Sequence, residues 1–427
     1  MDEILSAMKN LLTPVLFSYS LYTLISQSSS KSSYDKLLII SYDGFRYDYL
    51  DRELTPYLFS LKSSSTYAKH VINVFPTQTF VNHFSIATGL YSGVHGVIGN
   101  VVFNPKTGKL MTYGYDLFHY NKDITPIWTL NEKAGQGRHS GVMMWPGSQF
   151  AYAGISPTFV NIFDPRTPWE NRISTAISWF LHPKTPANLV MMYFEEPDDE
   201  EHTSGPGSLQ TRERLKKVDK LTEYLFKSLK DNSLADVNVV LLSDHGMESV
   251  TFDRMIDLTK IAGDKAVMYG TSPVLQIFPN KGQSVPNIYT KLNDAAAKNK
   301  HFKVYLKENI PEHFYIKDCE RTAPILAVAE PTYAFQDYYE AIDWQIKNKG
   351  APRNGTYGIH GYDPESINMR PYFIAHGPMF KENFNAGELR MVDMHPLFAN
   401  ILRLELPSLK PNGTLAGVQK ILKPKNK

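Results

Sequence analysis

The chain has 427 residues, enough for one large or two ordinary domains with a substantial buried core. Its 42% hydrophobic and 21% charged residues are typical of a globular protein, and a net charge of +2 argues against wrapping of nucleic acid. No uninterrupted apolar run reaches the roughly 18 residues of an ordinary transmembrane helix.

The N-terminal segment, residues 1–30, is predicted to be a secretory signal or leader. An apolar stretch, residues 11–25, follows Lys9 and precedes a serine-rich stretch with small residues near a potential cleavage point. Two acidic residues close to the N-terminus and Pro14 depart from the signal pattern. A disordered or membrane-touching leader is therefore the alternative.

Other features bear on an extracellular setting. Asn354 and Asn412 each begin an N-G-T sequon, so both are predicted glycosylation sites on surface loops. Cys319 is the single cysteine, which excludes an intrachain disulfide and leaves a buried thiol or a disulfide-linked dimer. The basic tail, residues 420–427, has a composition often found beside a membrane anchor, which would follow residue 427.

From residue 36 onward, short apolar runs of strand length alternate with amphipathic helical patterns. Continuous apolar runs predict strands buried on both faces, and helices between them predict a mostly parallel sheet covered on both sides. The predicted strands are residues 37–41, 141–145, 188–194 and 237–243, and the predicted helices are residues 55–61, 126–133, 169–181 and 212–230.

The second half of the chain continues in shorter units. Residues 270–330 read as a smaller α/β elaboration, and residues 347–368 as a polar loop rich in Gly and Asn. A further strand is predicted over residues 371–377 and a closing helix over residues 393–403. Because no linker divides the chain, we expect a single α/β domain from residue 36 to residue 422.

The segment 75–100 places a hydroxyl residue, Thr79, where a β-type run gives way to a helical pattern over residues 80–90. Unpaired N–H groups and the helix dipole at such a position attract phosphate-like anions and favour an alkoxide. Thr79 is therefore either an ordinary N-cap, worth about 1 kcal/mol, or a nucleophile. The choice depends on whether the chain supplies partners.

Metal-ligand residue types follow three of the predicted strands. Because the carboxyl ends of parallel strands form one edge of a sheet, we expect these residues to converge, together with a histidine in the polar loop. They are Asp43, Asp198, His202, Asp244, His245 and His360. Carboxylate and neutral imidazole suit zinc or a similar divalent ion. Six ligands exceed one tetrahedral ion, whereas two ions about 3.5–4 Å apart would use all of them and suit in-line displacement at phosphorus.

Six motifs of this chain resemble those of the ectonucleotide pyrophosphatase/phosphodiesterase family, within the alkaline phosphatase superfamily. The chain looks most similar to the short members of that family. They occur in family order and span roughly residues 36–422: YDGFR (42–46), FPTQTFVNH (75–83), HGVIGN (95–100), EEPDDEEH (195–202), SDHGM (243–247) and GIHGYD (358–363). The resemblance implies an alkaline-phosphatase-like α/β fold with a mostly parallel central sheet.

The resemblance also implies two zinc ions and a phosphothreonine intermediate formed on Thr79. One zinc would be held by Asp198, His202 and His360, and the other by Asp43, Asp244, His245 and the Thr79 oxygen. Asn100, with the backbone N–H after Thr79, would hold a phosphoryl oxygen. The chain departs from the family at Val81, Glu201 and Pro364, none of which is a ligand. Glu201 adds a negative charge that could affect metal affinity or repel anionic substrates.

The substrate expected from the resemblance is a nucleotide phosphodiester or pyrophosphate, or a choline-containing lipid. Nucleotide users place an aromatic ring against the base, and Phe159 is the candidate here, with Tyr152 and Phe163 as alternatives. An aromatic pocket also suits a quaternary ammonium, so choline phosphodiesters stay open. The alternative from another class, an inactive extracellular binding protein, would require a lost ligand or nucleophile, and all seven residues are present.

Overall fold

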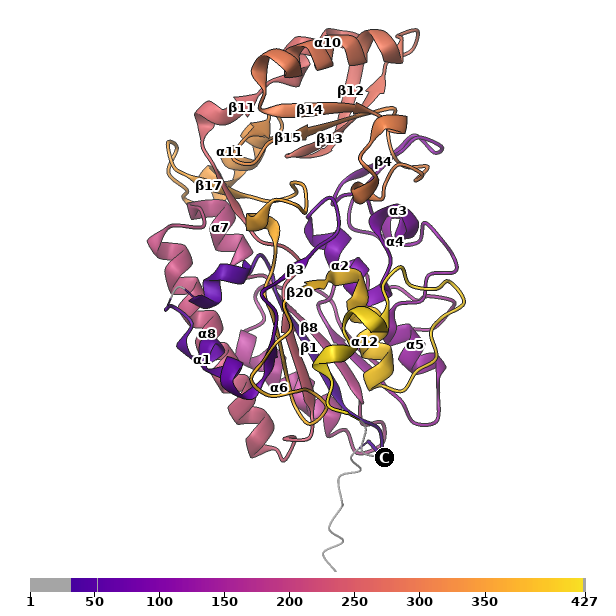
Figure 1. The fold of residues 1–427 in the computed structure, drawn as a ribbon, viewed down its shortest axis with the longest axis vertical. Coiled ribbons are helices and arrows are strands. Elements are labelled where there is room, and N and C mark those ends of the chain that lie inside the picture. The colour runs from indigo at the N-terminus through magenta and orange to yellow at the C-terminus, as the bar shows by residue number, and fades with distance from the viewer. Residues whose placement is uncertain (1–31, 52, 425–427) are drawn as a thin grey trace, which may run out of the picture.

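The computed structural model describes residues 32–51 and 53–424. The predicted leader, residues 1–30, and the last three residues of the basic tail lie outside the described residues. Figure 1 shows a large α/β portion with a smaller sheet-and-helix unit above it. Within the described part of the chain, no helix combines the length and the apolar character needed to cross a membrane.

The large portion is built on an eight-stranded sheet, in the order β19-β2-β18-β9-β1-β8-β6-β7. The pairs among β9, β1, β8, β6 and β7 are parallel, and β18 is antiparallel to both of its neighbours. The strands are β1 (Leu37–Tyr42), β2 (Thr66–Tyr67), β6 (Ser140–Met143), β7 (Phe159–Asn161), β8 (Leu189–Phe194), β9 (Asn238–Leu242), β18 (Phe373–His376) and β19 (Phe384–Asn385).

The apolar runs are continuous because both faces of the sheet are covered. Alternate residues of β1 face two different cores: Leu37 and Ile39 lie in one, and Leu38 and Ile40 in the other. The first core is closed by α2 (Thr79–Thr88), α5 (Ile127–Lys133) and α12 (Met394–Ile401), and the second by α1 (Pro56–Leu61), α6 (Trp169–Phe180) and α8 (Leu209–Asp231). The predicted fold class is confirmed.

The smaller unit is an insert between β9 and β18. Its four-stranded antiparallel sheet, in the order β12-β13-β15-β14, has a core of its own beneath α10 (Val285–Asn299). The strands are β12 (Ala266–Thr271), β13 (Val274–Pro279), β14 (Phe302–Leu306) and β15 (Ile325–Ala329). The elaboration predicted at residues 270–330 overlaps this insert, whose core also includes side chains before β12 and after β15, such as Leu258 and Tyr338.

Four short strand pairs lie outside these two sheets in the described part of the chain. They are β3 (His70–Ile72) with β20 (Glu388–Arg390), β4 (Val102–Asn104) with β5 (Lys109–Met111), β10 (Glu248–Val250) with β17 (Tyr357–Ile359), and β11 (Met255–Ile256) with β16 (Ala334–Phe335). The remaining α-helices are α3 (Ser92–His95), α4 (Tyr115–Phe118), α7 (Asp198–Ser204), α9 (Leu258–Ala262) and α11 (Tyr338–Lys349). The predicted polar loop at residues 347–368 therefore contains the end of α11 and all of β17.

Candidate active site

The carboxyl edge of the parallel strands carries the predicted ligands. Asp43 directly follows β1, Asp244 and His245 come two and three residues after the end of β9, and Asp198 begins α7 after β8. His360 directly follows β17. The structure therefore brings together all six residues that the sequence placed at strand ends and in the late loop.

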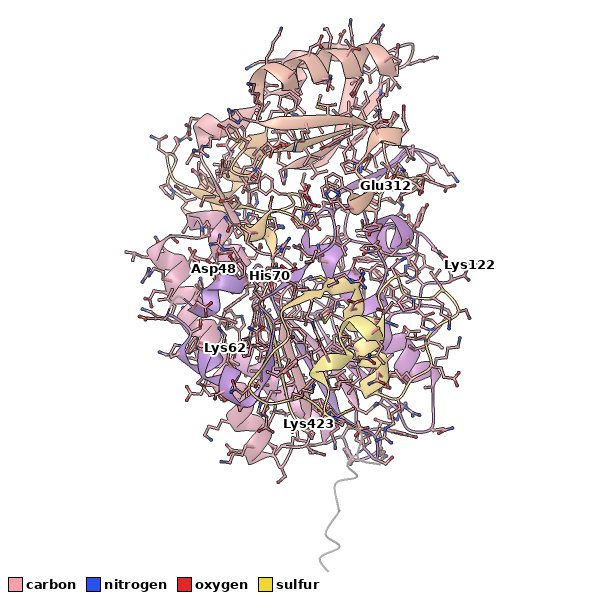
Figure 2. All side chains as sticks on the ribbon, in the orientation of Figure 1. Asp48, Lys62, His70, Lys122, Glu312 and Lys423 are labelled. Atoms are coloured by element: carbon pink, nitrogen blue, oxygen red, sulfur yellow. The ribbon has the colours of Figure 1, made fainter. Side chains whose placement is uncertain are left out.

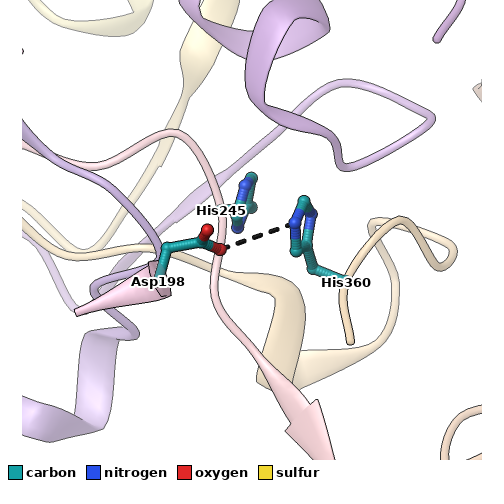
Figure 3. A group of neighbouring side chains, drawn as sticks. All are labelled: Asp198, His245 and His360. Atoms are coloured by element: carbon teal, nitrogen blue, oxygen red, sulfur yellow. Dashed lines mark ion pairs between the residues drawn. The ribbon is translucent and has the colours of Figure 1, made fainter. Parts of the chain in front are cut away.

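One cluster joins Asp198, His202 and His360. The two Nε2 atoms of the histidines lie 3.2 Å apart, and each lies 3.5 Å from Asp198 Oδ1. Figure 3 shows His360 facing this carboxylate from another segment of the chain. Ligand atoms around a tetrahedral ion with bonds of about 2.0–2.1 Å lie roughly 3.3–3.4 Å apart, so the spacing fits one such ion.

A second cluster lies beside the first and centres on His245. Its Nε2 atom lies 3.3 Å from Asp43 Oδ1, 3.0 Å from Asp244 Oδ2 and 3.3 Å from Thr79 Oγ1. The His245 ring stacks on the His360 ring with 3.6 Å between centroids, so the two clusters are in direct contact. The nucleophile candidate is thus in the second cluster, as expected.

The three histidines of the clusters are oriented by hydrogen bonds to the backbone. Each has its Nδ1 atom within hydrogen-bond distance of a backbone carbonyl, so that Nδ1–H donates and Nε2 is left facing the clusters. The contacts are His202 to Gly358 at 2.8 Å, His245 to Gly246 at 2.9 Å and His360 to Thr77 at 3.0 Å. Burial lowers the pKa of His202 to about 4, and burial with the other two rings lowers the pKa of His360 well below its usual value.

The carboxylates have one oxygen facing the clusters with no hydrogen-bond partner among the described residues: Asp43 Oδ1, Asp198 Oδ1 and Asp244 Oδ2. The other oxygen of Asp43 accepts from Tyr193 Oη at 2.6 Å, and that of Asp244 accepts from Ser243 Oγ at 3.1 Å. Buried polar oxygens without partners are costly, and a cation would satisfy them. The donor set and its orphaned oxygens therefore fit divalent ions.

Electrostatics support the same interpretation. Burial, Asp244 and Asp198 raise the pKa of Asp43 well above its usual range, and burial, Asp244 and Glu201 do the same for Asp198. Against the effect of burial, the imidazoles of His245 and His83 lower the pKa of Asp244. Crowded carboxylates of this kind repel one another until a cation neutralises them.

Thr79 is the first residue of α2, and the N-cap is Gln78, whose side chain makes no capping hydrogen bond. The N-cap role considered for Thr79 is therefore wrong, although the helix N-terminus does face the clusters. Asn100 Oδ1 accepts from the Phe80 N–H at 3.0 Å. The two predicted oxyanion donors are thus neighbours, and the backbone donor already has a partner in this state.

The three aromatic candidates for contact with the base lie in different surroundings. Phe159 pairs with Gly141 at the amino end of the sheet and stacks on Trp179 at 5.6 Å, so its selection as the base platform is wrong. Tyr152 is buried and donates to the Gly147 carbonyl. Phe163, beyond the carboxyl end of β7, is 49% exposed, and its centroid lies 5.9 Å from that of Tyr193, the partner of Asp43.

The structure bears on two points that the sequence left open. Glu201 is fully buried and accepts a hydrogen bond from Tyr49, so it does not face a substrate, and its charge acts on the site by adding to burial in raising the pKa of Asp198. Cys319 is 2% exposed, which agrees with the buried-thiol alternative and leaves it unavailable for an intermolecular disulfide in this conformation. Asn354 and Asn412 are exposed, and Asn412 Oδ1 accepts from the Tyr91 N–H.

Some supporting residues were not predicted. Tyr193 holds Asp43, and His83 lies with Nδ1 3.3 Å from Asp244 Oδ2 and Nε2 2.9 Å from Ser41 Oγ. His83 stands four residues after Thr79, so it occupies the same helix face, and that spacing was the available signal. Tyr193 had no sequence signal beyond its place at the end of a buried strand.

Known proteins are similar to this chain in sequence. A family model described as type I phosphodiesterase / nucleotide pyrophosphatase matches residues 37–363. Ectonucleotide pyrophosphatase/phosphodiesterase family member 5 from Homo sapiens is 33% identical over 418 residues, covering 96% of this chain and 82% of that protein. The bis(5'-adenosyl)-triphosphatase from Homo sapiens is 34% identical over 421 residues, covering 96% of this chain and 87% of that protein.

Solved structures agree. Murine ectonucleotide pyrophosphatase/phosphodiesterase 5 superposes with a TM-score of 0.81 at 33% identity, covering 91% of this chain and all of that one. The same murine protein is known as an inactive threonine-to-alanine variant in complex with AMP. The chain belongs to the ectonucleotide pyrophosphatase/phosphodiesterase family, and it is a hydrolase of the nucleotide pyrophosphatase/phosphodiesterase class.

Proposed function

We propose that this chain is an extracellular hydrolase that uses two zinc ions and a phosphothreonine intermediate on Thr79 to cleave nucleotide phosphodiester or pyrophosphate bonds. The observation that supports the proposal is the set of three carboxylate oxygens without hydrogen-bond partners beside imidazole Nε2 atoms, with Thr79 Oγ1 3.3 Å from His245 Nε2. Two adjacent ligand sets with a hydroxyl in one of them suit phosphoryl transfer.

Asp198, His202 and His360 would hold one zinc, and Asp43, Asp244 and His245 the other. When bound, the ions would lower the pKa of the nucleophile and neutralise the non-bridging phosphoryl oxygens. Thr79 Oγ loses its proton to solvent and forms a bond to phosphorus, while the bond to the leaving oxygen breaks and that oxygen takes up a proton. Water then attacks phosphorus and breaks its bond to Thr79 Oγ, which regains a proton. The N-terminus of α2, ten residues long, adds a favourable dipole for the phosphoryl group. The Asn100 side-chain amide donates to one of its oxygens.

A nucleotide is the preferred substrate class because relatives of this chain include a bis(5'-adenosyl)-triphosphatase and a murine protein complexed with AMP. The chain also supplies aromatic rings near the candidate site. Phe80 directly follows Thr79 and is partly exposed, with its ring packed 5.2 Å from that of Tyr113. Phe163 lies beside Tyr193. These two rings are our candidates for contact with the base.

The extracellular setting is supported by the signal-like leader pattern and by the exposed asparagines of both sequons. Secretion from a eukaryotic host, followed by treatment with an N-glycosidase, tests it. A mass decrease at Asn354 or Asn412 is the expected result, and retention of an unprocessed N-terminus in the cytosol would contradict it.

The enzymatic proposal is tested with a nitrophenyl nucleotide diester. We expect turnover that a chelator removes and zinc restores, and a loss of at least about 10³-fold in kcat/KM for Thr79→Ala. Thr88→Val, in the same helix with a hydroxyl that donates to the Phe84 carbonyl, is the matched control and should retain activity. Faster hydrolysis of phosphate monoesters or of choline phosphodiesters would contradict the nucleotide assignment.

A further inference from the structure

Gln78 connects the catalytic loop to the insert through the two ends of its side-chain amide. Its Oε1 atom accepts from the Asn100 N–H at 2.9 Å, and its Nε2 atom donates to the Thr271 carbonyl at 3.3 Å and to Thr271 Oγ1 at 3.0 Å. Thr271 ends β12, 193 residues further along the chain. The amide orientation follows from chemistry, because an N–H needs an acceptor and a carbonyl needs a donor.

Asn100 is held at two points, of which Gln78 supplies one. The Asn100 N–H goes to Gln78, and the Asn100 side-chain Oδ1 accepts from the Phe80 N–H at 3.0 Å. Among the described residues, nothing bonds to Asn100 Nδ2, so this N–H₂ group is left to donate to a ligand. The bond from Gln78 therefore fixes the backbone from which that donor extends.

At the Thr271 end of the contact, the backbone is held by further hydrogen bonds. Thr271 precedes the turn into β13, where Asp337 accepts from the Ser272 N–H at 2.8 Å and from Ser272 Oγ at 2.6 Å. The Gln78 side chain is 3% exposed, and a Cβ placed on Gly361 would lie 3.3 Å from its Nε2. Gly361 follows the ligand His360, so the amide of Gln78 is enclosed by the segments carrying the nucleophile, the oxyanion donor and a ligand.

We propose that Gln78 is a positioning residue, which sets the place of the Asn100 amide relative to Thr79 and anchors it to the insert through Thr271. The inference rests on the proposed function, because Asn100 has to contact the phosphoryl group for its position to affect the rate. Insert and catalytic loop thereby act as one rigid unit during phosphoryl transfer. A misplacement of about 1 Å at such a donor can cost up to about 100-fold in rate.

A double-mutant cycle with Asn100 tests the proposal. Gln78→Met removes all three hydrogen bonds of the side-chain amide at similar volume, and we expect kcat for a nitrophenyl nucleotide diester to fall about tenfold or more while KM changes little. In an Asn100→Ala background, Gln78→Met should lower kcat by less than about twofold, because its effect passes through Asn100. Thr271→Val, which removes only the hydroxyl partner, should give a smaller loss of the same kind.

The melting temperature and amide hydrogen exchange separate this role from a general folding defect. Gln276→Met is the matched control, since Gln276 is also buried and its Oε1 accepts from the Ala323 N–H at 2.7 Å within the insert. It should lower the melting temperature as much as Gln78→Met does but leave kcat unchanged. Amide hydrogen exchange at Asn100 should be faster in Gln78→Met than in the wild type.

The outcomes are distinct. An inactive wild-type chain would overturn the proposed function itself. An active wild type in which the losses from Gln78→Met and Asn100→Ala multiply would overturn the role of Gln78 alone, as would an unchanged kcat in Gln78→Met. Should Gln78→Met fail to fold, Thr271→Val and its cycle with Asn100→Ala decide the question by the same criterion.

Discussion

The Tyr193 hydroxyl donates a hydrogen bond of 2.6 Å to Asp43 Oδ2, while Asp43 Oδ1 lies 3.3 Å from His245 Nε2. One oxygen of the carboxylate is thus held from behind and the other faces the candidate metal cluster. Tyr193 comes from β8 and Asp43 directly follows β1, and parallel pairing of these strands places Ser41 opposite Tyr193. Sheet register therefore orients a metal ligand.

Removing this hydroxyl should weaken metal binding without removing a ligand. We expect Tyr193→Phe to lower the affinity of one of the two metal sites by about 10–100-fold, measured by competition with a chromogenic chelator. Tyr42→Phe is the control, because the buried Tyr42 hydroxyl contacts Thr222 Oγ1 at 2.9 Å. That variant should lose about 1 kcal/mol of unfolding free energy and keep its metal affinity.

The two clusters should be separable by metal analysis. We expect Asp198→Ala to retain about one divalent ion per chain where the wild type holds about two, since Asp43, Asp244 and His245 stay in place. Its neighbour Asp199 pairs with Lys349 at the surface, so Asp199→Ala should keep both ions and full activity. Equal metal content in the two variants would contradict the assignment of Asp198.

Two phenylalanines at opposite ends of β7 predict opposite phenotypes. Phe163→Ala should raise KM for a nucleotide diester several-fold, with little change in the melting temperature, because its ring is half exposed and lies beside Tyr193. Phe159→Ala should leave KM unchanged and cost about 1–3 kcal/mol of unfolding free energy, because its ring packs on Trp179. Steady-state kinetics and denaturant titration measure the two effects.

A buried histidine away from the site should make the fold sensitive to acid. His395 is fully buried, neither ring nitrogen has a hydrogen-bond partner among the described residues, and burial lowers its pKa to about 4. Below pH 6.5 the unfolded chain takes up a proton that the folded chain does not, so the free energy of unfolding falls as pH falls toward 4. Between pH 7.5 and pH 5 this costs about 2 kcal/mol.

His395→Met tests this effect by comparison with the wild type, because both proteins keep the same metal ligands. Relative to the wild type, the variant should gain about 2 kcal/mol of unfolding free energy between pH 7.5 and pH 5 in urea titrations. A difference between the two proteins that does not change with pH would show that His395 takes up its proton equally in the folded and unfolded states.

Much of the site was predictable because it depends on strand ends. Continuous apolar runs marked β1, β8 and β9, and parallel pairing brings Asp43, Asp198 and Asp244 to the same edge. The strand containing residues 373–376 was also found, but its antiparallel direction was not, since an apolar run has no direction. Phe159 was chosen wrongly because an aromatic residue does not show from sequence at which end of a strand it lies.

Contacts across the chain could not be predicted. The bond from Tyr193 to Asp43 spans 150 positions, and that from Gln78 to Thr271 spans 193. Neither pair forms a motif, because the first contact depends on the register of β1 against β8 and the second on how the insert packs against the segment before α2. The burial of Glu201 and its hydrogen bond from Tyr49 were likewise not predicted from the sequence, although the Glu201 charge does act on the site by adding to burial in raising the pKa of Asp198.

The last described residues return to the amino edge of the parallel strands, away from the candidate site at the carboxyl edge. Phe380 bridges Leu422, and the Lys423 N–H donates to the Met379 carbonyl at 2.8 Å. Figure 2 shows Lys423 at the pole opposite the insert. A support, dye or affinity handle attached next to Lys423 would therefore leave the candidate site free of the attachment. This pole is thus the better choice for immobilising the protein in binding or turnover assays.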